Sequence, residues 1–143
     1  MNIQLKKLSE SALLPVRGSE YAAGYDLFSD IDSDVSIAPH ETKLIGTGIS
    51  VAIPDGYFGG IYARSGLSSK EGLRPANCTG VIDSDYFYSD NEGHIFVKIT
   101  NHSDKVLSVK KGEAFVQGIF MKYYKTVDDD TATDRNGGIG STN

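Results

Sequence analysis

Short alternating apolar runs, broken by glycine, proline or aspartate, constrain the fold of this 143-residue chain more than any other feature. Ile49, Val51 and Ile53 alternate with small or polar residues, and a Pro-Asp-Gly turn at residues 54–56 then ends the run. The same pattern recurs at residues 2–6, 35–37, 95–99, 106–109 and 114–124. Strands at intervals of about 8–12 residues indicate an all-β sandwich or barrel. Only residues 66–73 could hold a short helix.

Length, composition and charge limit the cellular compartment and the binding partners that we expect for this protein. The length suits one domain. A single cysteine, Cys78, excludes an intramolecular disulfide and is expected to be a small buried hydrophobe. The sequence contains neither a signal peptide nor the ~20 apolar residues that span a bilayer, so we expect a cytoplasmic protein with no membrane partner. The net charge of −5 argues against non-specific nucleic-acid binding but permits a small anionic ligand.

The C-terminal segment differs in character from the rest of the chain. An acidic run at residues 128–130 is followed by residues 131–143, which are nearly free of large apolar side chains. Such a segment cannot bury enough apolar surface to fold by itself. We therefore expect a domain at residues 1–127, with residues 128–143 forming a flexible linker and a glycine-rich arm that a ligand would order.

Two carboxylates and an aromatic ring follow the apolar run at residues 80–82. A carboxylate such as Asp83, held against apolar surroundings, can act as a base, and the ring of Tyr86 can form the floor of a pocket. In an uninterrupted strand Asp83 and Asp85 share a face, while Tyr86 points the other way. If Asp83 and Tyr86 line one pocket, the chain must turn or bulge around residues 84–85. The alternative is an ordinary hairpin rim.

Other polar residues can likewise be interpreted either as ligand-binding groups or as ordinary structural ones. Arg64, Ser65 and Gly66 offer donors and close backbone approach to phosphate oxygens, or they form a strand-to-helix junction capped by Ser65. Asn77 could pair with the edge of a nucleobase or stabilise a turn. Gln117 places an amide in an apolar strand, which is costly without a partner and so indicates a specific role.

The remaining candidates lie in the arm and among the histidines. Residues 135–142 combine a guanidinium, three glycines and two hydroxyls, which could cradle a phosphate or form a flexible tail. The histidines occur singly, with no metal-ligand spacing, and we expect them at the surface or in turns.

Taken together, five segments resemble the motifs of the trimeric deoxyuridine triphosphate nucleotidohydrolases (dUTPases), in the family's order across nearly the whole chain. They are Ala22-Ala23-Gly24-Tyr25-Asp26-Leu27, Arg64-Ser65-Gly66-Leu67, residues 77–86, residues 112–117 and residues 135–142. The resemblance implies a jelly-roll-like homotrimer with active sites at the subunit boundaries. It also implies that the arm closes over a site formed largely by other subunits.

The resemblance implies hydrolysis of dUTP to dUMP and pyrophosphate, which supplies dUMP and limits uracil incorporation into DNA. Asp83 would activate water for attack on the α-phosphorus, and Tyr86 would pack under the deoxyribose and exclude a 2′-hydroxyl. Asn77, with the hairpin backbone, would read uracil. The other implied substrate-binding residues are Gly80 and Val81 in the hairpin, Arg64, Ser65, Gly66 and Gln117 at the phosphates, and Arg135, Gly138, Ile139, Gly140, Ser141 and Thr142 in the arm. The implied cofactor is Mg²⁺, with Asp26 near it through water.

Three departures from the family's motifs concern the surroundings of the site. Ile139 stands where the family usually has a Phe that stacks on uracil, so we expect weaker closure of the arm. After Tyr86 the usual Arg-Gly-Glu is replaced by a longer connection at residues 87–92. Ala114 replaces an Arg of the fourth motif, which removes one possible ion pair. The chemical groups of the motifs are nevertheless kept.

Two other functions compete with dUTP hydrolysis. A dCTP deaminase on the same fold uses a glutamate on the strand after the third motif, where this chain has Lys98, which cannot do the same proton transfer. A non-catalytic trimeric nucleotide-binding or regulatory protein is suggested by Ile139 and by the altered hairpin. Ammonia release from dCTP would identify the first alternative, and absence of pyrophosphate release from dUTP would favour the second.

Overall fold

The computed structural model of the chain describes residues 2–67 and 72–139, which are almost entirely β-structure. The strands are β1 (Gln4–Lys7), β2 (Val16–Arg17), β3 (Tyr25–Phe28), β4 (Val35–Ile37), β5 (Thr42–Gly46), β6 (Ile49–Ala52), β7 (Tyr57–Ala63), β8 (Leu73–Pro75), β9 (Gly80–Ile82), β10 (Phe96–Asn101), β11 (Leu107–Val109) and β12 (Ala114–Lys122). A 3₁₀-helix, η2, spans Ser84–Tyr88. Residues 65–67 are helical, and the rest of the expected short helix lies partly outside the described residues.

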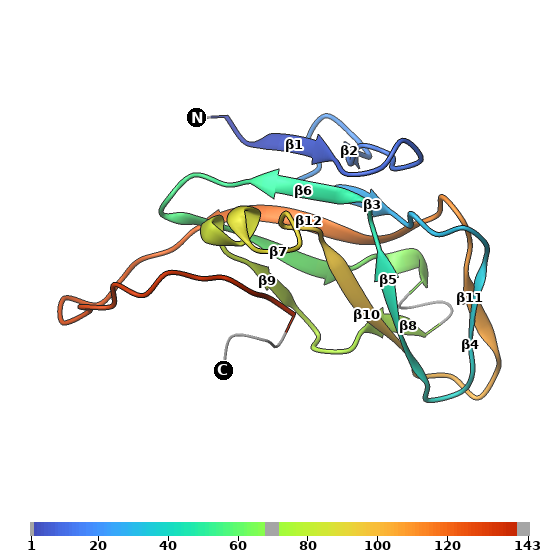
Figure 1. Cartoon of the computed structure of the whole chain (residues 1–143). Coiled ribbons are helices and arrows are strands. Elements are labelled where there is room, and N and C mark those ends of the chain that lie inside the picture. The colour runs from blue at the N-terminus through green and yellow to red at the C-terminus, as the bar shows by residue number, and fades with distance from the viewer. Residues whose placement is uncertain (1, 68–71, 140–143) are drawn as a thin grey trace.

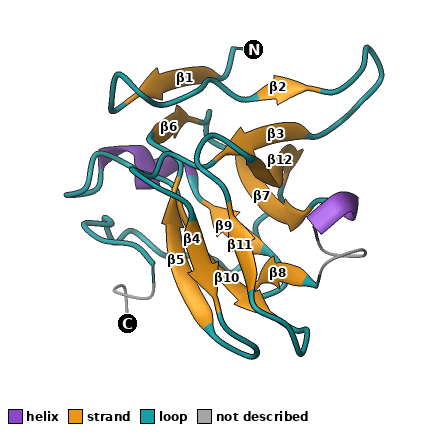
Figure 2. Cartoon of the chain, turned by 90° about the vertical axis from the view of Figure 1, so that its right-hand side faces the viewer, coloured by secondary structure: helices purple, strands orange, loops and turns teal. Residues whose placement is uncertain are grey.

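The strands pair only in antiparallel fashion within the described residues. The largest sheet has five strands in the order β2-β3-β12-β7-β9, and a second has the order β5-β10-β8. Two further pairs, β1-β6 and β11-β4, complete the structure. Figures 1 and 2 show these sheets gathered around one interior. The expectation of an all-β, jelly-roll-like sandwich is confirmed.

The alternating pattern of the sequence decides which side chains enter this interior. In β10, Val97, Ile99 and Asn101 are buried, whereas Lys98 between them is exposed. Successive side chains of a strand point to opposite faces, so Val97 and Ile99 form an apolar surface on one face, which Asn101 continues as a buried polar group. Ile37, Ile45, Ile49, Val109 and Val116 have no exposed surface at all.

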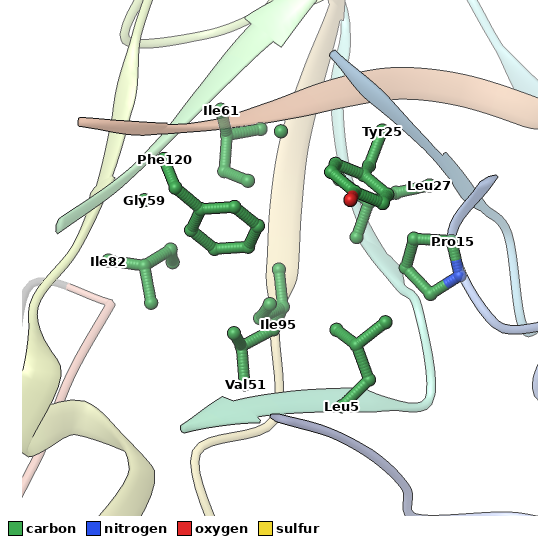
Figure 3. A pocket seen from close by; sticks show the side chains of 11 residues that line it. Leu5, Pro15, Tyr25, Leu27, Val51, Gly59, Ile61, Ile82, Ile95 and Phe120 are labelled. Carbon is green, nitrogen blue, oxygen red and sulfur yellow. The ribbon is translucent and has the colours of Figure 1, made fainter. Parts of the chain in front are cut away.

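A small cavity of about 20 Å³ lies inside the core between β1, β6 and the five-stranded sheet. Figure 3 shows Leu5, Val51, Ile61 and Phe120 directed into it. A cavity of this size holds at most about one water, and water needs polar partners that this lining does not provide. The cavity is therefore a feature of core packing and not a binding site. No helix within residues 2–67 and 72–139 is long and apolar enough to cross a membrane.

Candidate active site

The turn required between Asp83 and Tyr86 is present. Strand β9 ends at Ile82, Asp83 stays extended (φ −77°, ψ 157°), and η2 begins at Ser84. The 3₁₀-helix breaks the two-residue alternation, so Tyr86 turns inward and is only 4% exposed. The side chain of Asp83 stays about half exposed, at 47%. The chain after β9 is thus not a continuous strand, because a 3₁₀-helix turns Tyr86 away from the alternation that Asp83 follows.

A pocket of about 280 Å³ opens beside this hairpin. Its size approaches the lower end of the ~300–1,000 Å³ typical of small-molecule sites. Asn77, Gly80, Val81 and Tyr86 line it, so four of the residues proposed to read base and sugar share one hollow. Its other lining groups include Lys98, Arg135 and Ile139.

Arg135 joins the arm to the two carboxylates of the hairpin. Its Nη2 donates to Asp83 Oδ2 at 2.5 Å, and its Nε lies 2.9 Å from Asp85 Oδ1. The Nε–H is buried and not aligned with any acceptor, so the contact with Asp85 is an ion pair without a directed hydrogen bond. One guanidinium therefore offsets the repulsion between two neighbouring carboxylates, and an incoming anion would compete with both for Arg135.

The arm also packs on the ring of Tyr86. Figure 1 shows the chain after β12 turning back toward β9, and Asp90 N donates to Asn136 O at 3.4 Å. A Cβ placed on Gly138 would lie 2.3 Å from Cε2 of Tyr86, so only glycine permits this approach. Ile139 follows with φ 54°, a left-handed conformation that is rare for a β-branched residue. Gly140, Ser141 and Thr142 lie outside the described residues.

A second group of candidate residues gathers around Arg64, just after β7. Arg64 Nε and Nη2 donate to Asp26 Oδ1 and Oδ2 at 2.8 and 3.2 Å, which is the paired geometry of a guanidinium with a carboxylate. Arg64 Nη1 donates to Ala114 O at 2.9 Å. Ala114, which lacks a side chain for an ion pair, thus contributes its backbone carbonyl instead.

The amide of Gln117 belongs to the same group. A register shift between Ala114 and Val116 in β12 places Gln117 opposite Asp26 on β3. Gln117 Nε2 donates to Ala63 O at 2.9 Å, and a Cβ on Gly24 would lie 2.3 Å from its Oε1. Ala63 O thus gives the amide nitrogen a partner within the chain, which removes much of the burial cost from which a specific role was predicted.

The two groups lie at opposite ends of β7. Ile82, which precedes Asp83, pairs with Gly59, whereas Arg64 follows five residues later. Five residues of extended strand span about 16 Å. The fold of one chain therefore brings Tyr86, Asp83 and Arg135 together, and places Arg64 about this far along β7 from Asp83.

Several features of the site could not be anticipated from the sequence. Asn91 Nδ2 and the backbone carbonyl of His94 bond the hydroxyl of Tyr86; Asn91 lies in the unmatched connection, and His94 lies in the loop before β10. His94 is partly buried and not a surface histidine: its Nε2 accepts from Gly48 N at 2.9 Å, and burial lowers its pKa. The expectation that Cys78 is buried is wrong, because it is exposed in a turn with φ 63°.

Metal ligation by protein side chains alone finds little support in this arrangement. Within residues 2–67 and 72–139, no three His, Cys, Asp or Glu side chains gather closely enough to hold a metal ion. Both oxygens of Asp26 accept hydrogen bonds from Arg64. Any Mg²⁺ here would need most of its ligands from water or from a bound phosphate.

Comparison with known proteins links the chain to one family. The family model for dUTPase matches residues 10–143. A deoxyuridine 5′-triphosphate nucleotidohydrolase of Lactococcus lactis is 41% identical over 132 residues, covering 90% of this chain and 87% of the relative. A crystal structure of dUTPase from Streptococcus mutans matches with a TM-score of 0.78 and 34% identity, over 88% of this chain and 98% of that one.

A second solved structure concerns a metal. It is a mutant dUTPase from phage phi11 of S. aureus, described for the coordination of a structural Mg(II) ion. It matches with a TM-score of 0.73 and 28% identity, over 91% of this chain and 99% of that one.

Proposed function

Because the chain belongs to the dUTPase family, we propose that it hydrolyses dUTP to dUMP and pyrophosphate by attack of water on the α-phosphorus. This reaction supplies dUMP and limits uracil incorporation into DNA. The observation that carries the proposal is the hairpin from Asn77 to Tyr86, which lines a nucleoside-sized pocket together with Arg135, the residue that bonds Asp83.

The pocket provides the contacts that a deoxyuridine needs. The Asn77 amide and the backbone at Gly80 and Val81 bind the polar edge of uracil, where cytosine would leave donors unpaired. The buried ring of Tyr86 packs beneath the deoxyribose. A 2′-hydroxyl would meet this ring, so ribonucleotides are excluded by steric contact.

Asp83 acts as the general base. Arg135 engages its Oδ2, so we assign Oδ1 to the proton of the attacking water. A positioned base of this kind typically contributes about 10²–10⁴-fold to the rate. Arg135 therefore has two roles: it orients the carboxylate of Asp83, and it contacts the phosphates of the substrate.

A homotrimer with shared sites accounts for the separation of the two groups along β7. Arg64, Ser65, Gly66 and Gln117 of one subunit would meet the phosphates of a nucleotide held by the hairpin of another. The backbone distance of about 16 Å along β7 supports this assignment, because it sets Arg64 well apart from Asp83 within one chain.

The arm closes the site. Residues 128–143 act as the linker and the arm, and Gly140, Ser141 and Thr142 extend the grip of Arg135 on the outer phosphates. Arg135 to Ile139 lie on the hairpin of their own chain in the structure. Exchange of this segment between subunits is the arrangement that the family resemblance implies.

Mg²⁺ fits this site as a companion of the substrate. With few protein ligands nearby, the ion would be held mainly by triphosphate oxygens and waters, and Asp26 would contact it through water. When bound, Mg²⁺ neutralises part of the triphosphate charge, which an acidic chain with a net charge of −5 offsets poorly.

Pyrophosphate release from dUTP with Mg²⁺ present tests the proposal, with dTTP, dCTP and UTP as competitors. Asp83→Asn should lower turnover by about 10²-fold or more. Asp85→Asn is the matched control, because it also loses a charge that faces Arg135 but keeps the base. A wild-type protein without activity would refute hydrolysis and favour a non-catalytic nucleotide-binding protein. Ammonia release from dCTP would favour a deaminase despite Lys98.

A further inference from the structure

The connection after Tyr86 surrounds the hydroxyl of that residue with hydrogen bonds. Tyr86 Oη donates to His94 O at 2.5 Å and accepts from Asn91 Nδ2 at 2.9 Å. The ring lies between this network and Gly138, whose Cα sits close to Cε2. Hydrogen bonds thus hold the hydroxyl, and Gly138 packs against the adjacent edge of the ring.

The side chain of Asn91 is itself fixed in one orientation. Its Oδ1 accepts from Ser89 Oγ at 2.8 Å and from Gly93 N at 3.2 Å. An amide whose oxygen accepts on one side and whose nitrogen donates on the other cannot flip without losing these bonds. Because the turn fixes the Asn91 side chain, the hydrogen bond from Asn91 Nδ2 holds the Tyr86 hydroxyl in one position.

The turn keeps its shape through bonds that do not involve the Asn91 side chain. Ser89 Oγ also contacts Tyr86 O at 2.7 Å, Glu92 N donates to Ser89 O at 2.9 Å, and Ser50 Oγ donates to Glu92 O at 2.7 Å. Left-handed conformations at Glu92 and Gly93, with φ 60° and 71°, turn the chain back toward the ring. Loss of the Asn91 amide would free the ring more than it would unfold the turn.

We propose that Asn91 is a positioning residue that fixes the Tyr86 ring and thereby sets the discrimination between 2′-deoxyribose and ribose. This inference rests on the proposed function, in which Tyr86 packs beneath the sugar. Steric rejection of one hydroxyl requires a ring that does not yield, and displacements of about 1 Å are large on this scale. With Asn91 removed, His94 O alone would hold the hydroxyl, and the ring could pivot about that contact.

The first experiment measures kcat and KM for dUTP and UTP in Asn91→Ala and Asn91→Asp. The Asp variant keeps the acceptor for Ser89 and Gly93 but replaces the donor to Tyr86 with an acceptor, so the single proton of the Tyr86 hydroxyl can no longer serve a complete bond to position 91 and to His94 O at once. Each variant should lower the dUTP-to-UTP ratio of kcat/KM by roughly tenfold, the factor that corresponds to about 1.4 kcal/mol. The change should come from KM, with kcat for dUTP nearly constant.

Asn101→Ala is the matched control. Asn101 is likewise an amide that bonds neighbouring backbone on both sides, with Nδ2 donating to Ile37 O and Lys105 O and Oδ1 accepting from Ser103 N, although it is fully buried whereas Asn91 is exposed. Its removal should lower the melting temperature and leave the sugar ratio unchanged. An equal fall of the ratio in Asn101→Ala would show that general loosening explains the effect, and would overturn the inference.

A double-mutant cycle links the two residues directly. Tyr86→Phe removes the hydroxyl, so adding Asn91→Ala to it should lower the ratio no further. Additive effects, or wild-type ratios in both Asn91 variants, would overturn the inference while leaving dUTP hydrolysis intact. Wild-type discrimination in an active Tyr86→Ala enzyme would instead refute the sugar contact itself, and with it the role of Asn91.

Binding of dUMP and UMP, measured by calorimetry, reads the same discrimination without turnover. The Asn91 variants should lower the ratio of the UMP dissociation constant to the dUMP dissociation constant by the same factor of roughly ten. If the wild type hydrolyses no dUTP, this measurement still tests Asn91, because it depends only on the sugar pocket. Equal narrowing in Asn101→Ala would again count against the inference.

Discussion

Gly138→Ala should detach the arm from the hairpin with little effect on the stability of the domain. The added Cβ would lie 2.3 Å from Cε2 of Tyr86, whereas carbon atoms in contact are about 3.5–4.0 Å apart. A displacement of at least about 1 Å is therefore needed. The ring is 4% exposed and holds two hydrogen bonds, so the exposed arm moves instead.

The consequence reaches the site through Arg135, three residues before Gly138. A shift of that size would break its contacts with Asp83 and Asp85 and misplace a group that faces the phosphates. Misplacement by about 1 Å can cost about 10²-fold, so we expect kcat/KM for dUTP to fall by roughly 10- to 100-fold. The free energy of unfolding should change by less than about 0.5 kcal/mol, as for other surface changes.

Steady-state kinetics, thermal melting and limited proteolysis of the arm provide the assay. Gly18→Ala is the control for the glycine-to-alanine change itself, because a Cβ there meets nothing within 4 Å. Wild-type kinetics in Gly138→Ala, together with unchanged protection of the arm from protease, would refute the packing argument. A large loss of melting temperature would refute the separation of arm from domain.

Three further outcomes are expected. Deletion of residues 133–143 should reduce turnover far more than the melting temperature, and full turnover would show that the arm is dispensable. Ile139→Phe should lower the KM for dUTP, since stacking on a base is worth about 1–3 kcal/mol, and an unchanged or higher KM would contradict this. Burial lowers the folded-state pKa of His94, so the unfolded chain binds more protons and the free energy of unfolding should fall as pH drops below about 6.5. Denaturant titrations at several pH values should show this slope weakened in His94→Asn, and an identical slope would exclude His94 as its source.

The local pattern of the sequence was sufficient for the fold class and for one detail of the site. Alternation with a period of two predicts strands wherever apolar and polar residues exchange, and β10 follows it residue by residue. The same rule places Asp83 and Tyr86 on opposite faces unless the chain turns between them, and η2 provides that turn.

The alternating pattern of apolar and polar residues does not predict contacts between segments that are distant in the sequence. The pairing of Asp26 with Arg64 joins residues 38 positions apart, and it depends on the register of β3 and β7 against β12. The hydrogen bond from Asn91 to the Tyr86 hydroxyl depends on the left-handed conformations of Glu92 and Gly93, and no residue pattern in the sequence predicts it. Cys78 was misjudged for the same reason, because burial of a single residue is set by what other segments place over it.

The sequence by itself determined that this chain forms an antiparallel β-structure carrying the groups for nucleotide chemistry, since side-chain alternation and turn residues act over a few positions. Only the tertiary structure decided that those groups form two clusters at opposite ends of β7, because strand pairing sets which positions meet. The register of β9 against β7 thus fixes how far Asp83 lies from Arg64, which no local pattern of the sequence encodes.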